Sequence, residues 1–117
     1  MEKQIINTTS APAPIGPYNQ AILAGDMLFI SGQICIDPPT GALKNQDIQQ
    51  ETHQVMHNLR SILTAADMTF HNVVKTTIFI TDMHRFRRSM KFMENILTAM
   101  AAFLLEKPYK CQHCQNL

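Results

Sequence analysis

The stretch Asn19-Gln-Ala-Ile-Leu-Ala-Gly-Asp-Met-Leu-Phe-Ile-Ser-Gly32 decides the fold. Two short apolar runs, Asn19–Leu23 and Met27–Ser31, flank a Gly-Asp turn signal, which is typical of a β-hairpin. The segment before the hairpin, residues 11–18, is rich in proline and cannot be helical, so we expect an ordered extended loop there. These signals predict that the chain opens with antiparallel sheet.

The sequence after the hairpin alternates between helical and strand patterns. Residues 47–66 carry apolar side chains at three- and four-residue spacing, and Asp47 is followed three residues later by a glutamine, as in a capping box. Residues 73–81 are mostly β-branched and predict a central strand, and residues 86–105 predict a second helix. This order predicts one α+β domain over residues 1–117, with an antiparallel or mixed sheet and its helices on one face.

Composition narrows the class of protein. The chain has 117 residues, of which 45% are hydrophobic and only 16% charged, so we expect apolar surface to be buried in an oligomer. The net charge of +1 gives no electrostatic basis for nucleic-acid binding, which is not expected. No apolar run approaches the roughly 20 residues that span a bilayer. The residues after Met1 lack the layout of a signal peptide, so we expect no membrane association and a cytoplasmic location.

Two patterns resemble metal-binding motifs, but neither predicts a metal site. His53 and His57 have the i, i+4 spacing of metal ligands, but a glutamine stands where an H-E-x-x-H motif has glutamate, so a polar helix face is favoured. Cys111 and Cys114 resemble the opening of a zinc finger but supply two ligands, too few for a tetrahedral site. We therefore predict no metal.

Ser31 and Gly32 follow an apolar strand, where exposed backbone N–H groups suit a carboxylate or an oxyanion. In most proteins these are ordinary loop residues. The basic cluster of Arg85, Arg87, Arg88 and Lys91 opposes the dipole of the predicted second helix at its start, so it does not serve the helix.

Four separated motifs, in order, resemble the RidA (YjgF/YER057c/UK114) family over residues 4–83. They are Ala11-Pro-Ala-Pro-Ile-Gly-Pro-Tyr-Asn-Gln20, Leu28-Phe-Ile-Ser-Gly-Gln-Ile34, Asp37-Pro-Pro-Thr-Gly41 and Val74-Lys-Thr-Thr-Ile-Phe-Ile-Thr-Asp-Met83. The resemblance implies a chorismate-mutase-like subunit, a homotrimer with active sites in clefts between subunits, and no metal or organic cofactor. It implies hydrolysis of small 2-imino or enamine carboxylates, such as 2-aminoacrylate, to 2-oxo acids and ammonia.

The resemblance also implies binding residues. Tyr18 is expected to line the cleft, Ser31 and Gly32 to offer hydroxyl and backbone contacts to the substrate, and Ile34 and Cys35 to continue the wall. For Cys35 a plain buried thiol is the favoured interpretation. The catalytic groups remain unassigned.

The chain departs from the family pattern after residue 83. The family has a Pro-Ala-Arg motif, whose arginine suits a carboxylate clamp, and a glutamate in a final strand, and residues 85–117 contain neither. We therefore expect the C-terminal strands to be missing or altered and the deaminase activity to be impaired. Three alternatives remain: a non-catalytic binding or chaperone-like module, a member of the translation-inhibitor or ribonuclease type, and a zinc module built on the tail.

Back-translation offers a cause for this departure. Codons for residues 102–116, read two bases out of step, permit Phe-Pro-Ala-Arg-Lys-Thr-Val-Gln-Val-Ser-Ala-Leu-Pro-Lys, which contains the missing motif. The same shift over residues 85–97 permits Phe-Ser-Thr-Val-Asn-Glu-Val-Tyr-Gly-Lys-Tyr-Phe, and its Glu and Gly are forced by the codons of Met90 and Met93. We hypothesise a reading-frame slip near residues 84–85, with a genuine divergent tail, for example from alternative splicing, as the other interpretation.

The nucleotide sequence spanning the codons of Met83 to Leu117 tests this hypothesis. The expected result is an open shifted frame that reads through Pro-Ala-Arg into a strand containing glutamate. A shifted frame that is closed, or that encodes unrelated residues, would show instead that the tail is genuine.

Overall fold

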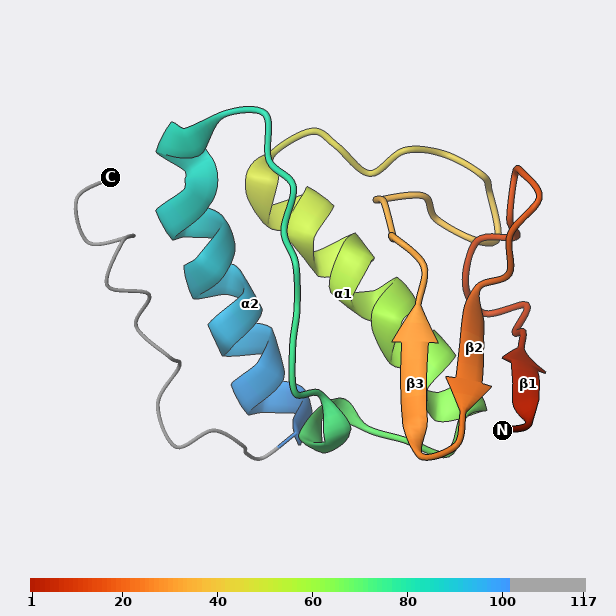
Figure 1. Cartoon of the computed structure of the whole chain (residues 1–117). Helices are drawn as coiled ribbons and strands as arrows, with labels where there is room; N and C mark the ends of the chain where they lie inside the picture. Colours follow the sequence, from red (N-terminus) through yellow and green to blue (C-terminus); the bar gives the residue numbers. More distant parts are fainter. Residues whose placement is uncertain (102–117) are drawn as a thin grey trace.

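The computed structural model describes residues 1–101, with the side chains of residues 96–101 left aside. Its elements in chain order are β1 (Lys3–Ile6), β2 (Ala21–Ala24), β3 (Met27–Ile30), α1 (Ile48–Ala65), the short 3₁₀ turns η1 (Phe70–Asn72) and η2 (Met83–Arg85), and α2 (Phe86–Ala101). Figure 1 shows the three strands side by side, with α1 crossing behind them and α2 lying next to α1. The predicted α+β class is confirmed.

The three strands form an antiparallel sheet in the order β1-β2-β3. The predicted hairpin is confirmed as β2 and β3, which are joined through Gly25 in the left-handed region at φ 61°. The strand β1 was not predicted, because its four residues carry no turn signal and three of them are exposed. The register places Ile5 beside Ile22 and Ile22 beside Phe29, so one apolar row crosses the sheet.

Helix α1 joins the two parts of the core. Ile62 packs with residues of β1, β2 and the proline-rich loop. Met56 and Leu63 pack with Phe70, and the half-buried Met93 of α2 packs against this cluster. The predicted cap is present, since the Asp47 carboxylate accepts the N–H of Gln50 at 2.7 Å. The Gln50 side chain accepts the N–H of residue 46 rather than that of Asp47, so the reciprocal half of the capping box is shifted by one residue.

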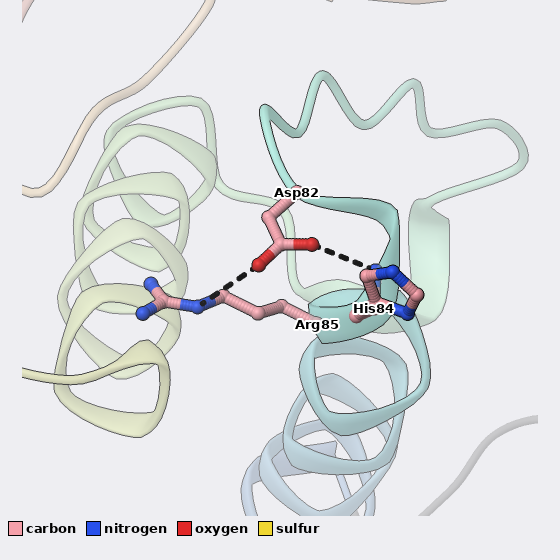
Figure 2. A network of polar contacts seen from close by, with 3 residues as sticks. All are labelled: Asp82, His84 and Arg85. Atoms are coloured by element: carbon pink, nitrogen blue, oxygen red, sulfur yellow. Dashed lines mark hydrogen bonds and ion pairs between the residues drawn. The ribbon is translucent and has the colours of Figure 1, made fainter.

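Helix α2 begins at the predicted residue, and the remainder of the predicted range 86–105 lies outside the described residues after Ala101. The structure explains how a basic helix start is tolerated. Asp82 accepts the N–H of His84 at 3.0 Å, and its carboxylate lies 3.8 Å from the guanidinium of Arg85 (Figure 2). The carboxylate supplies the negative charge that favours the N-terminal end of a helix.

The prediction of a central strand over residues 73–81 is wrong, since the structure assigns no regular element between η1 and η2. In Figure 1 this part of the chain runs as an extended tube between η1 and η2, without a strand arrow. The N–H of Val73 bonds to the carbonyl of Phe70 at 3.1 Å, but residues 74–81 make no hydrogen bond to another described residue. β-Branched side chains favour a pleated, half-buried surface, and a strand also requires a neighbour with which to pair.

Gln20 anchors the proline-rich loop to the sheet. Its side chain, only 3% exposed, accepts the N–H of Thr8 at 2.7 Å and donates to the carbonyls of Thr8, Ala11 and Pro12 at 3.0, 3.3 and 2.9 Å. Prolines have no N–H to donate, so this loop depends on such a side chain to satisfy its carbonyls.

Replacing Gln20 with leucine should lower the free energy of unfolding by about 2 kcal/mol or more, because several buried backbone groups lose their partner. Urea denaturation measures the change. The matched control is Gln49→Leu on the exposed face of α1, for which we expect less than about 0.5 kcal/mol. Equal effects of the two substitutions would contradict an anchoring role for Gln20.

Candidate functional site

Ser31 is hydrogen-bonded to Asn19 and Gln20, the two residues that follow Tyr18 in the chain. Its N–H donates to the carbonyl of Gln20 at 3.0 Å, and its hydroxyl donates to the carbonyl of Asn19 at 2.6 Å. The structure thus brings the end of β3 and the end of the proline-rich loop together, as a shared site requires. Because the hydroxyl proton is held by Asn19, the oxygen is left to accept a hydrogen bond from a ligand.

Gly32 offers the complementary group. A β-carbon added at Gly32 would meet no atom within 4 Å, so the space beside its backbone is open. Its N–H has no hydrogen-bond partner in the part of the chain that the structure describes. Gly32 is exposed and directly follows Ser31, so two neighbouring residues offer one backbone donor and one oxygen acceptor. Such a pair would suit a small ligand with both a carboxylate and an N–H group.

The Tyr18 side chain is 48% exposed and available for contact. Its backbone N–H donates to the carbonyl of Gly16 at 2.8 Å, and its ring lies across Gly16. A β-carbon at Gly16 would come within 3.3 Å of the Tyr18 ring, so glycine at this position permits the ring to lie close to the backbone. Sequence reasoning missed Gly16, although its place two residues before the tyrosine was the available signal.

Ile34 and Cys35 lie on a segment that is held by a buried amide of α1. Asn58 is fully buried, and its side chain donates to the carbonyls of Ile34 and Ile36 at 3.1 and 2.9 Å. Its own oxygen accepts from the side chain of Gln54 at 3.0 Å. Ile34 is 54% exposed, whereas Cys35 is buried. The sequence analysis did not single out Asn58, although a polar residue between apolar helix positions was the available signal.

The environment of Cys35 keeps its thiol neutral. Burial raises the pKa of Cys35 most, and the nearby negative charge of Glu51 raises it further, which outweighs hydrogen bonds from the backbone of Cys35 and Lys44. A raised pKa opposes the thiolate form that a nucleophile or a metal ligand needs. These data support the plain buried thiol.

The five predicted residues do not close a pocket on the described chain. A hollow of about 610 Å³ adjoins Ser31 through Asn19 and Gln20, and its other lining residues are Asn7, Thr8, Thr9, Ala11, Ala13, Pro14 and Pro38. A second hollow of about 420 Å³ lies at the start of α1 and is lined by Lys44, Asp47, Gln49, Gln50, His53 and Gln54. Tyr18, Ser31, Gly32, Ile34 and Cys35 line neither, so their grouping as one site stays a prediction.

The basic cluster does not complete this site. The Arg85 guanidinium is engaged by Asp82, and Arg87 and Arg88 are exposed at the start of α2. His53 and His57 are exposed on α1, and the described residues contain no group of three side chains suited to a metal ion. Cys111 and Cys114 lie outside the described residues. No described helix is both long and apolar enough to cross a membrane.

Comparison with known proteins defines the class. The family model described as "Endoribonuclease L-PSP" matches residues 8–112, so the match continues past the end of the predicted resemblance at residue 83. The chain is 49% identical over 86 residues to a RutC family protein of Pyrococcus horikoshii, which covers 74% of this chain and 68% of the relative. It is 45% identical over 84 residues to the 2-iminobutanoate/2-iminopropanoate deaminase of Mus musculus, which covers 72% and 62%.

The fold agrees with these relatives. The crystal structure of Escherichia coli TdcF with bound serine superposes with a TM-score of 0.80 at 31% identity, covering 92% of this chain and 89% of that one. The chain belongs to the endoribonuclease L-PSP family, the family of the RidA and RutC proteins.

Replacing Glu51 with glutamine should lower the pKa of Cys35, because one of the charges that raise it is removed. The thiolate fraction then increases at mildly alkaline pH, and alkylation of Cys35 by iodoacetamide should become faster. Mass spectrometry of the peptide that contains Cys35 measures this rate separately from the other cysteines. The matched control is Glu2→Gln at an exposed position, and equal rates in both variants would contradict the assignment.

Proposed function

We propose that the chain hydrolyses small 2-imino or enamine carboxylates to 2-oxo acids and ammonia, with lowered efficiency. The observation that carries the proposal is the pair of a donor at Gly32 and an acceptor at Ser31. Ser31 is hydrogen-bonded to Asn19 and Gln20, the two residues that follow Tyr18. Family membership supports it, since relatives at 43–45% identity are named 2-iminobutanoate/2-iminopropanoate deaminase.

The two groups match the two ends of an imino acid. The Gly32 N–H donates to the substrate carboxylate, and the Ser31 oxygen accepts the N–H of the imine. Water adds to the carbon of the C=N bond, the C–N bond then breaks, and the nitrogen leaves as ammonia with the two protons that the water supplies. The Tyr18 side chain is 48% exposed, and we assign its hydroxyl to donate a proton toward the leaving nitrogen.

The efficiency is lowered because the carboxylate lacks a guanidinium partner among the described residues near Ser31. A bidentate contact between arginine and a carboxylate contributes on the order of 3 kcal/mol, so its loss corresponds to about a hundredfold in kcat/KM. The remaining N–H contact is neutral and weaker.

We also propose a cytoplasmic homotrimer. The low fraction of charged residues supports self-association. Exposed apolar side chains on the sheet support it too, since Ile5 is 55% and Phe29 61% exposed in the row that crosses the strands. An open site on one chain is consistent with a cleft completed by a neighbouring subunit.

A non-catalytic binding module is the second candidate. The neutral groups at Ser31 and Gly32 favour it, because binding an imino acid through them requires no arginine, whereas efficient turnover does. A ribonuclease or translation-inhibitor activity has less support, since the net charge is only +1.

The deciding experiment follows formation of 2-oxobutanoate and ammonia from 2-iminobutanoate that is generated in the assay. We expect turnover that is unaffected by a chelator and is reduced about tenfold in Tyr18→Phe, the cost of one hydrogen bond. The matched control is Ser10→Ala, which removes an exposed hydroxyl directly before the same loop and should leave the rate unchanged. No turnover by a chain that still binds a 2-oxo acid would favour the binding module.

A further inference from the structure

Two backbone edges in the described part of the chain have no partner. Strand β3 pairs with β2 alone, so its other edge presents N–H and C=O groups that meet no strand. Residues 74–81, the extended segment between η1 and η2, make no backbone hydrogen bond to another described residue. Unpaired edges of this kind are templates for the addition of a strand.

The two edges belong to the same layer of the molecule. Leu28 and Ile30 of β3 pack against the core cluster around Phe70, and Val73, directly before the extended segment, packs against that cluster as well. Figure 1 shows the extended segment on the side of β3 that faces away from β2, with no strand drawn between them. One strand placed there would have a free edge on each side.

The side chains of both edges alternate as in a sheet with one covered face. Ile78 and Ile80 are half-buried, while Phe79 between them is 94% exposed. In β3, half-buried positions alternate with exposed positions in the same way. A strand that joins the two edges therefore needs an apolar side chain at every second position and polar side chains between them.

The topology indicates which part of a sequence belongs at this position. Helix α2 begins after η2 and also contacts η1, so it returns the chain to the start of the extended segment. In a β-α-β unit, the strand that follows such a helix runs parallel to the first strand in the same sheet. The sequence expected between the two edges is therefore the one that follows α2.

The residues that follow α2 in this chain do not have the required pattern. None of residues 102–117 is valine, isoleucine or threonine, and Pro108 lies among them. A proline has no backbone N–H and is excluded from the centre of a sheet. The shifted reading frame of the same codons permits Lys-Thr-Val-Gln-Val-Ser-Ala-Leu, in which Val, Val and Ala alternate with Thr, Gln and Ser.

We propose that β3 and the extended segment together bind one extended peptide in trans, which pairs with β3 on one side and with residues 74–81 on the other. The peptide class is a strand of about eight residues with alternating β-branched and polar side chains, and the shifted-frame sequence is a member of it. Backbone hydrogen bonds provide the affinity and the alternation provides the selectivity. The exposed sheet face with Ile5 and Phe29 stays free for the proposed self-association.

Binding of a labelled peptide to the full chain tests the pairing on both sides. The probe is Lys-Thr-Val-Gln-Val-Ser-Ala-Leu-Pro-Lys, and fluorescence anisotropy measures its Kd. Successive strand residues direct their N–H groups to opposite neighbours, so N-methylation of the two valines removes donors on one side. N-methylation of the threonine and the glutamine removes donors on the other side. Each pair should weaken binding at least tenfold, whereas N-methylation of the last lysine, beyond the paired residues, should change Kd less than twofold.

An effect of only one methylated pair would overturn the proposal, because the peptide would then add to a single edge. An effect of neither pair would overturn it as well, because binding would then not depend on backbone pairing. The protein itself is unchanged in all of these measurements, so a folding defect cannot produce either result.

Hydrogen exchange with the same peptide identifies the edges and the occupant. Amides of residues 74–81 should exchange rapidly in the free chain at every concentration, and saturating peptide should slow them at least tenfold together with the outward-facing amides of β3. Three results would contradict the proposal. Slow exchange in the dilute free chain would show that residues 102–117 already occupy the position. Protection that increases with chain concentration would identify a second copy as the occupant, and unchanged exchange with peptide would place binding elsewhere.

Discussion

The buried amide of Asn58 is the interaction on which the candidate site depends. Its side-chain N–H groups donate to the carbonyls of Ile34 and Ile36, which fixes the chain after β3 to α1. The same segment belongs to no regular strand, and an isolated β-bridge pairs Ile36 with Leu43. A buried amide without partners costs about 1–3 kcal/mol, so alternative positions of this segment are disfavoured. Gln20 acts in the same way on the proline-rich loop, and the two amides together set the position of Ser31 between them.

Local signals in the sequence predicted local structure. The hairpin and α1 followed from turn chemistry and periodicity, because neighbouring residues decide both. The sequence marked Asn58 as a polar residue among apolar helix positions, but it did not identify the partners of Asn58 or Gln20, because these carbonyls lie 8 to 24 residues away in the chain. The prediction of a strand over residues 73–81 was wrong for a related reason. β-Propensity describes the preference of single side chains, whereas a strand forms only when its backbone pairs with a neighbouring strand. The five site residues came from motif resemblance, and only the coordinates reveal that the Ser31 proton is already used.

The proposed site separates two requirements, recognition and catalysis. The first half of the chain supplies one backbone donor at Gly32 and one oxygen acceptor at Ser31, which are the groups that the proposal assigns to recognition. Neutralising the carboxylate charge is a different requirement, and an arginine is the side chain suited to it. The described part of the chain shows no hydrogen bond or ion pair between an arginine and Ser31 or Gly32. The chain retains the fold of a family member, and the lowered efficiency proposed above rests on the charged contribution to transition-state stabilisation that an arginine would make.

Helix α2 packs against α1 through few specific side-chain contacts. It packs on α1 through half-buried Met93 and a buried hydroxyl pair, Thr52 and Ser89, 3.4 Å apart. An amphipathic helix with one hydrogen-bonded polar pair can pack stably on another helix, because the hydrophobic effect has no directional requirement. A strand has no such freedom, because its hydrogen bonds are directional and must meet a partner in register. This difference agrees with the described part of the chain, where α2 is packed on α1 while the β-branched segment between η1 and η2 makes no backbone hydrogen bond to another described residue.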